Sequence, residues 1–145
     1  MTTKKLSLLG VSFAQAFVAM AGSLYFSEIR GFPPCILCWY QRIAMYPLVA
    51  ILGVALYSDD ENVPKYVLPL SIIGMGIAIY HNLLYYNVIP EAIAPCRLGI
   101  SCTTQYISYF GFVTIPLLSL CAFTVITVCM VLMLKGRKQA TKTPA

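Results

Sequence analysis

The stretch that decides the fold is GFPPCILCWYQRIAMYPLVAILGVALY, residues 31–57. Two prolines precede a Cys-X-X-Cys pair, Cys35 and Cys38, and an arginine, Arg42, follows four residues after the second cysteine. The mostly apolar run 39–57 approaches the roughly 20 residues that a helix needs to cross a bilayer. The sequence therefore predicts a thiol pair and a positive charge at the beginning of a membrane helix.

The rest of the chain has the same membrane character. Of its 145 residues, 59% are hydrophobic and 10% are charged, whereas a typical soluble domain carries about 25% charged residues. Four apolar segments are long enough to cross a bilayer, approximately 6–26, 39–57, 66–86 and 107–134. We therefore expect one all-α integral membrane domain over residues 1–145, a bundle of four transmembrane helices with a polar tail at 135–145. The first segment exceeds the apolar core of a secretory signal, and we expect it to be retained as a span.

Basic residues at the ends of the spans predict the orientation. Only Arg30 and Arg97 lie in the two loops that carry cysteines. Seven basic residues lie on the opposite side: Lys4, Lys5, Lys65, Lys135, Arg137, Lys138 and Lys142. Because Lys and Arg are enriched on the cytoplasmic side, both termini are predicted there, and both cysteine-bearing loops are predicted outside, where disulfides persist. The net charge of +5 could suggest a nucleic-acid partner, but the basic residues lie mainly at the chain ends beside apolar runs. We therefore expect a multi-pass protein of the cell membrane in contact with lipid, and no nucleic-acid partner.

Small residues recur at helical spacing in two of the predicted spans. They are Ser12, Ala16, Ala19 and Ser23 in the first, and Ser71, Gly74 and Ala78 in the third. Because small residues let membrane helices approach closely, we expect these stripes to face neighbouring helices. Gln15 in the first span is expected to bond between helices rather than to a ligand.

The six cysteines form three pairs in the sequence: Cys35/Cys38, Cys96/Cys102 and Cys121/Cys129. The last pair lies inside the fourth span, eight residues apart, which is about 80° away from a shared helix face. Free cysteines often behave as small buried apolar side chains, and we expect this of Cys121 and Cys129.

The pair Cys35/Cys38 has the features of a redox centre. Pro34 favours a helix that begins at Cys35, so that both sulfurs lie in its first turn, where the helix N-terminus lowers the pKa of a thiol. Arg42 lies one turn beyond Cys38 and about 6 Å deeper, where it would hold Cys38 as a thiolate. A structural disulfide remains an alternative. A zinc site completed by Cys96 and Cys102 is another, but five residues separate that pair, wider than usual, and we expect no metal.

Electrons released by the thiols need an acceptor. The chain has no haem-attachment or dinucleotide-binding motif, so the acceptor is expected to be diffusible, and a quinone dissolved in the bilayer fits. Arg42 would hydrogen-bond a quinone oxygen as negative charge develops; the alternative is an arginine that anchors the helix at the membrane interface. His81, at a similar depth in the third span, is a candidate to line the same pocket or donate a proton, with a structural role as the alternative.

The loop 87–106 carries the second pair. Val88, Ile89, Ala92 and Ile93 recur at helical spacing, which predicts a short helix on the membrane surface. An exposed Cys96/Cys102 disulfide beside it would meet a soluble partner and pass oxidising equivalents to Cys35/Cys38.

Four stretches resemble the DsbB family of membrane thiol–quinone oxidoreductases, most closely its short Gram-positive, BdbC-like form. They are PCILCWYQR (34–42), YHNLLYYNVIP (80–90), PCRLGISCTTQYI (95–107) and FGFVTIPLLSL (110–120). The resemblance implies an enzyme that reoxidises an extracytoplasmic thioredoxin-like thiol–disulfide oxidase and passes the electrons to a membrane quinone, menaquinone or ubiquinone.

The resemblance also implies residue roles. Cys38 would face the quinone with Arg42 beside it and His81 nearby, and Cys35 would exchange with the second pair. Cys96 would form the mixed disulfide with the partner, and Cys102 would resolve it. The second pair is more tightly spaced than in the larger Gram-negative members.

Two other functions fit parts of the pattern. One is a vitamin K epoxide reductase-like enzyme, but there the loop cysteines precede the Cys-X-X-Cys pair. The other is a non-catalytic membrane subunit or transporter stapled by disulfides.

Overall fold

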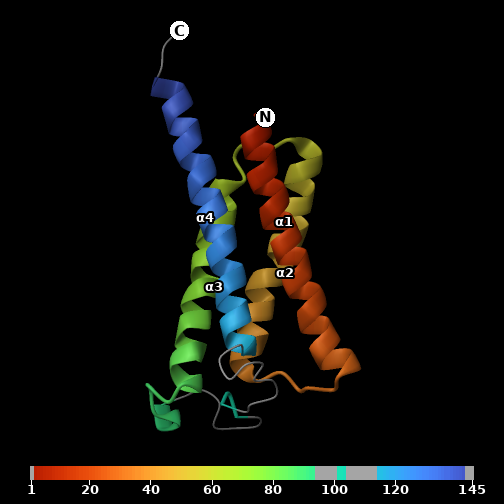
Figure 1. The fold of residues 1–145 in the computed structure, drawn as a ribbon, viewed down its shortest axis with the longest axis vertical. Coiled ribbons are helices and arrows are strands. Elements are labelled where there is room, and N and C mark those ends of the chain that lie inside the picture. The colour runs from red at the N-terminus through yellow and green to blue at the C-terminus, as the bar shows by residue number, and fades with distance from the viewer. Residues whose placement is uncertain (1, 94–100, 104–113, 143–145) are drawn as a thin grey trace.

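The computed structural model describes residues 2–93, 101–103 and 114–142, and its main elements are four long helices (Figure 1). These are α1 (Thr3–Leu24), α2 (Ile36–Ser58), α3 (Pro64–Tyr85) and α4 (Ile115–Lys142). A π-helical turn, η1 (Tyr25–Ile29), extends α1, and a short 3-10 turn, η2 (Glu91–Ile93), follows α3. All four helices are long and apolar enough to cross a membrane, which confirms the predicted all-α membrane fold.

The helices form a closed ring of neighbours. α1 packs on α2, α2 on α3, α3 on α4, and α4 back on α1. Both termini lie at one end of the bundle with the α2–α3 turn, residues 59–63, which we call the terminal end (Figure 1). The opposite end, which we call the cysteine end, carries η1, the start of α2 and residues 86–93 and 101–103.

Close packing between α3 and α4 depends on Gly74. A Cβ atom built there would lie 2.2 Å from Cε1 of Phe123, whose side chain is fully buried on α4. Ser71 and Ala78, one turn to either side, are fully buried as well. The small-residue stripe predicted for the third span therefore does face a neighbouring helix, as expected from the close approach that small residues permit.

The two cysteines of α4 have different surroundings. Cys129 is buried in the core, as predicted, but Cys121 is exposed on the outer face of the bundle, so the prediction was wrong for Cys121. The angular offset of their eight-residue spacing explains the difference, because it turns one sulfur away from the core when the other faces it.

The cysteine end begins with a well-defined stop of α3. Asn87 has a left-handed φ of 57°, and the N–H groups of Asn87 and Val88 donate to the carbonyl oxygens of Leu84 and Leu83. This double hydrogen bond is the Schellman arrangement that closes many helices. The surface helix predicted to follow is represented in the described residues only by the three-residue turn η2; the remainder of that prediction lies outside them.

Candidate redox site

Cys35 and Cys38 are brought together by the start of α2. Cys35 has an extended backbone (φ −73°, ψ 173°) and caps the helix, because its Sγ accepts the backbone N–H of Cys38 at 3.4 Å. The helix thus begins at Ile36, one residue later than predicted, with Cys38 in its first turn. The two sulfurs lie 3.1 Å apart as free thiols, the geometry required of a pair that opens and closes as a disulfide.

The contacts favour Cys35 as the thiolate of the reduced pair. When Cys35 ionises, the Cys38 thiol donates to it, and this hydrogen bond lowers the pKa of Cys35 from 9.0 to about 4 against the opposing effect of burial. His81 and the backbone N–H of Cys38 act in the same direction. Sequence analysis had assigned the thiolate to Cys38 because of Arg42; that assignment missed the helix cap formed by Cys35.

His81 is buried between the two cysteine-bearing segments. Its Nε2 lies 3.9 Å from Sγ of Cys35 and 3.2 Å from the carbonyl oxygen of Cys102, while its Nδ1 lies 3.2 Å from Nε2 of Gln41. Since an amide nitrogen only donates, Nδ1 accepts from Gln41, and Nε2 carries the ring hydrogen. The Nε2–H group of His81 therefore donates to the carbonyl oxygen of Cys102, and it also lies next to the sulfur of Cys35.

Cys102 lies beside the Cys-X-X-Cys pair. It is disulfide-bonded, and it is buried in one apolar cluster with Cys35, Leu37 and Leu84. Cys38 packs on the edge of this cluster. Cys96, its predicted partner, lies outside the described residues.

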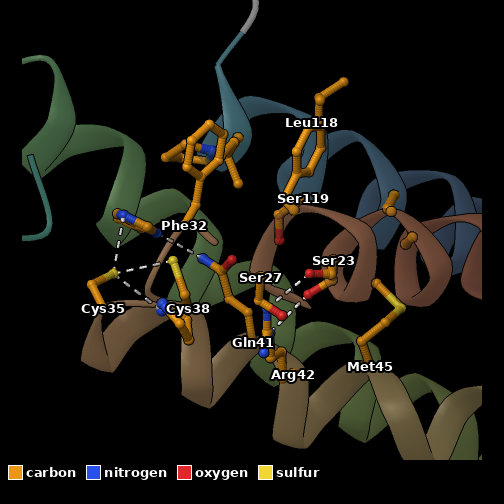
Figure 2. A pocket seen from close by; sticks show the side chains of 18 of the residues that line it. Ser23, Ser27, Phe32, Cys35, Cys38, Gln41, Arg42, Met45, Leu118 and Ser119 are labelled. Carbon is orange, nitrogen blue, oxygen red and sulfur yellow. Dashed lines mark hydrogen bonds between the residues drawn. The ribbon is translucent and has the colours of Figure 1, made fainter. Parts of the chain in front are cut away.

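Arg42 lies in the same helix as Cys38, one turn further on, and reaches across to α1. Its Nε donates to the hydroxyl of Ser23 at 2.8 Å and its Nη2 to the Ser23 carbonyl at 2.9 Å (Figure 2). The guanidinium lies 5.4 Å from the ring centre of Trp39. Within the described residues, no carboxylate pairs with it and Nη1 has no hydrogen-bond partner. An arginine in a membrane helix without a counter-ion is a candidate functional residue.

A cavity of about 300 Å³ connects these groups. Side chains of all four helices line it, and its walls are mainly apolar, among them Phe26, Met45 and Phe123. Its polar lining includes Gln15, Ser23, Gln41, Arg42, Tyr46 and His81. Figure 2 shows Cys38 between Cys35 and Gln41, with Arg42 and Ser23 farther along the same wall. The cavity thus joins the thiol pair to the arginine, and His81 lines it as predicted.

Three polar residues of this cavity escaped sequence analysis. Gln41 orients His81, Ser23 holds Arg42, and the Tyr46 hydroxyl is buried without a hydrogen-bond partner in the part of the chain that the structure describes. The signal for Gln41 and Tyr46 was their position three and four residues after Cys38 and Arg42, on the face that those side chains share. Gln15 lines the cavity and makes no hydrogen bond with the described residues, so the bond expected between helices is absent there.

Comparison with known proteins agrees with this architecture. The family model described as disulfide bond formation protein DsbB matches residues 4–134. The chain belongs to the DsbB family. It is 54% identical over 134 residues to disulfide bond formation protein C of Bacillus subtilis, covering 92% of this chain and 96% of that protein. It is 47% identical over 137 residues to probable disulfide formation protein C of Halalkalibacterium halodurans, covering 94% and 100%. No solved structure matches the chain.

Membership in the DsbB family confirms the predicted activity class. The protein is a membrane oxidoreductase that generates disulfide bonds, a thiol:quinone oxidoreductase by family. Its multi-pass character agrees with the four candidate spans. The two other functions considered for the sequence, a vitamin K epoxide reductase-like enzyme and an inert stapled subunit, are not supported.

Proposed function

We propose that the protein reoxidises an extracytoplasmic thioredoxin-like thiol oxidase through Cys96 and Cys102, and passes the electrons through Cys35 and Cys38 to a membrane quinone. The observation that carries this proposal is the cavity that joins Cys38 to Arg42. It lies at the cysteine end, which the distribution of Lys and Arg assigns to the outer side of the membrane.

The cavity has the properties that a quinone ring requires. Its volume of about 300 Å³ is at the lower end of the range for small-molecule sites, and its walls are mainly apolar. The donors of this cavity that lack protein partners among the described side chains include Nη1 of Arg42 and the hydroxyl of Tyr46, whose burial without a hydrogen bond is costly. They come from successive turns of α2. These donors suit the carbonyl oxygens of a quinone, and menaquinone and ubiquinone both offer such oxygens.

The proposed relay conserves atoms and electrons at each exchange. A partner thiolate attacks Cys96 and opens the Cys96–Cys102 disulfide, and a second partner thiolate then releases the oxidised partner. The Cys102 thiolate attacks Cys35 in the Cys35–Cys38 disulfide, with Cys38 as the leaving thiolate. Cys96 then attacks Cys102, which restores the loop disulfide and leaves Cys35 and Cys38 reduced. The burial of Cys35 and Cys102 in one cluster supports this order.

Reoxidation of Cys35 and Cys38 completes the cycle. A bound quinone would supply the oxidising power, taking two electrons and one proton from the thiol–thiolate pair and its second proton from water. Cys35, held as a thiolate by the Cys38 hydrogen bond and the His81 N–H, is the nucleophile that closes the disulfide onto Cys38. Arg42 stabilises negative charge next to Cys38 in a site of low dielectric constant, where such interactions are strong.

The test is a quinone-reduction assay with the purified protein in nanodiscs and a reduced thioredoxin-like protein as donor. We expect one quinol for each donor disulfide formed. A donor that keeps only its attacking cysteine should be trapped on Cys96 of the wild-type protein, because no second donor thiolate remains to release it; mapping the linked peptide after non-reducing electrophoresis identifies the cysteine. Cys102→Ser has no loop disulfide to offer and should not turn over. A link to Cys35, or normal turnover of Cys102→Ser, would show that the relay order is wrong. Donor oxidation without quinol formation would exclude the quinone as acceptor.

A further inference from the structure

Three potential metal ligands converge at the cysteine end. The sulfurs of Cys35 and Cys38 and a ring nitrogen of His81 all lie within 4.8 Å of one another. Individual separations are 3.1 Å between the sulfurs and 3.9 Å from Cys35 Sγ to His81 Nε2. A tetrahedral zinc ion with bonds of about 2.0–2.3 Å separates its ligand atoms by about 3.5–3.8 Å. Small side-chain rotations therefore bring all three atoms to bonding distance of one ion.

We infer that the reduced centre is a binding site for a thiophilic divalent cation such as Zn²⁺, held by Cys35, Cys38 and His81. Two thiolates and one imidazole form a ligand set that zinc enzymes use, with a fourth position left to water. Binding displaces the two thiol protons and involves no electron transfer. The site exists only in the reduced state, because disulfide formation removes both thiolates. The cation therefore inhibits the enzyme by holding the reduced pair.

His81 must change tautomer to bind the cation. Its Nε2, which carries the hydrogen in the cation-free site, becomes the ligand, and the hydrogen moves to Nδ1. Gln41 accommodates the change, since rotation of its amide presents an oxygen in place of the nitrogen 3.2 Å from Nδ1. A hydrogen-bonded partner on the second ring nitrogen is the usual support of a metal-bound histidine. Gln41 thus serves as the positioning residue of the site in both tautomers.

The cavity gives the cation a route to these ligands. Cys35, Cys38 and His81 all line it, next to Gln41. Arg42 lines the same cavity, but its guanidinium is bonded to Ser23 on α1 and is not bonded to the three ligands. Once the two thiolates form, their charge balances that of the divalent ion.

The test measures Zn²⁺ binding by the full-length protein in nanodiscs, without quinone or partner. Oxidised and reduced wild type are compared anaerobically by competition with a chromophoric chelator, and Co²⁺ spectra report thiolate ligation. We expect one ion per reduced chain at this centre and none per oxidised chain. Equal binding by the two forms would overturn the inference without recourse to any variant.

Variants separate this site from other thiols. Cys96→Ser/Cys102→Ser should keep the site, and loss of binding there would indicate instead the four-cysteine zinc site considered for the sequence. Cys38→Ser and His81→Asn should each abolish stoichiometric binding. Gln41→Leu should weaken it about 10–100-fold, whereas the matched control Gln15→Leu, in the same cavity but away from His81, should not. Unchanged affinity in His81→Asn would refute the ligand set.

Inhibition is measured independently of the natural acceptor. Zn²⁺ should slow reoxidation of the reduced pair by a small thiol oxidant, and a chelator should restore the rate. If Zn²⁺ binds but does not slow this reaction, the inhibitory role is wrong. Because no quinone is present, failure of this inference leaves the proposed function untouched, and failure of the proposed function leaves this inference untouched.

Discussion

At the terminal end of the bundle, polar groups satisfy one another. Lys5 on α1 pairs with Glu61 in the α2–α3 turn at 3.2 Å, and Arg137 on α4 donates to the side-chain oxygen of Asn62 at 2.9 Å. At the cysteine end, by contrast, Arg42 has no counter-ion among the described residues, and the Tyr46 hydroxyl is buried without a partner. These contacts at the terminal end join α1 and α4 to the α2–α3 turn, whereas the cysteine end has donors without protein partners among the described residues.

The polar groups that are paired at the terminal end stabilise the fold, whereas the unpaired ones at the cysteine end are candidates for function. Exposed ion pairs at a bundle end contribute at most modest stability. Unsatisfied polar groups inside a membrane protein cost free energy, and they persist where a ligand or a reaction uses them. Substitutions at the cysteine end should therefore change activity more than stability, and substitutions at the terminal end should do the reverse.

The largest expected effect is that of Cys38→Ser. Without Cys38 the Cys35 disulfide cannot form, so quinone reduction should be abolished, while the loop pair can still exchange with the partner. The thermal melting temperature should change little, because serine is nearly the same size. Cys121→Ser, which alters a free cysteine on the outer face of α4, is the matched control and should retain full activity. Residual quinone reduction by Cys38→Ser would remove this residue from the pathway.

The next effect concerns how the alkylation rate of reduced Cys35 depends on pH. Its pKa of about 4, lowered by the Cys38 hydrogen bond, keeps the thiolate present at every pH well above 4. Alkylation of reduced Cys35 should therefore be almost constant from pH 9 to pH 6, whereas alkylation of a thiol of ordinary pKa slows about 200–500-fold over that range. Peptide mapping of the labelled protein measures this in the Cys121→Ala/Cys129→Ala background. A tenfold fall in the alkylation rate per pH unit would show that the pKa of Cys35 is not lowered, and Cys35 would not be the thiolate of the reduced pair.

Arg42→Met should cost on the order of 2–4 kcal/mol in kcat/KM for quinone, because it removes a donor from the developing charge. Lysine should rescue only part of this, since it lacks the planar fork that bonds Ser23. Arg137→Met at the terminal end removes the same charge and should leave kcat/KM unchanged. Equal losses in the two variants would mean that Arg42 only anchors the helix.

The sequence predicted the parts of this site that depend on position along one helix. The i, i+3 spacing of the cysteines and the i, i+4 spacing of Cys38 and Arg42 follow from helix geometry alone. The partners of those residues come from other helices: Ser23 from α1 holds Arg42, and His81 from α3 contacts Cys35. Helix rotation determines such contacts, and hydrophobic periodicity is nearly uninformative about rotation when lipid-facing and core-facing residues are both apolar.

The same limit explains the outcome at Cys121: the offset of about 80° indicates that Cys121 and Cys129 do not share a face, but the two are equally apolar and the sequence does not show which one faces the core. Gly74 was the exception among the core positions, because a glycine within a small-residue stripe marks a contact between helices whatever the rotation. The cap by Cys35 also escaped prediction: a cysteine in place of the usual serine or aspartate gave no signal that its sulfur would accept the helix N–H.

The smallest expected effect is that of the Lys5–Glu61 pair at the terminal end. Lys5 is partly buried and Glu61 partly exposed, so solvent screens their attraction, and Lys5→Met should destabilise the bundle by no more than about 1 kcal/mol. A thermal melt in nanodiscs should show this loss at low salt and a smaller one at high salt, because screening already weakens the pair. The double variant Lys5→Met/Glu61→Gln should lose no more than Lys5→Met alone, since the first change already removes the interaction. Quinone reduction should be unaffected in both. A loss of activity comparable to that of Arg42→Met would mean that the terminal end is coupled to the redox centre, and the contrast between the two ends would no longer hold.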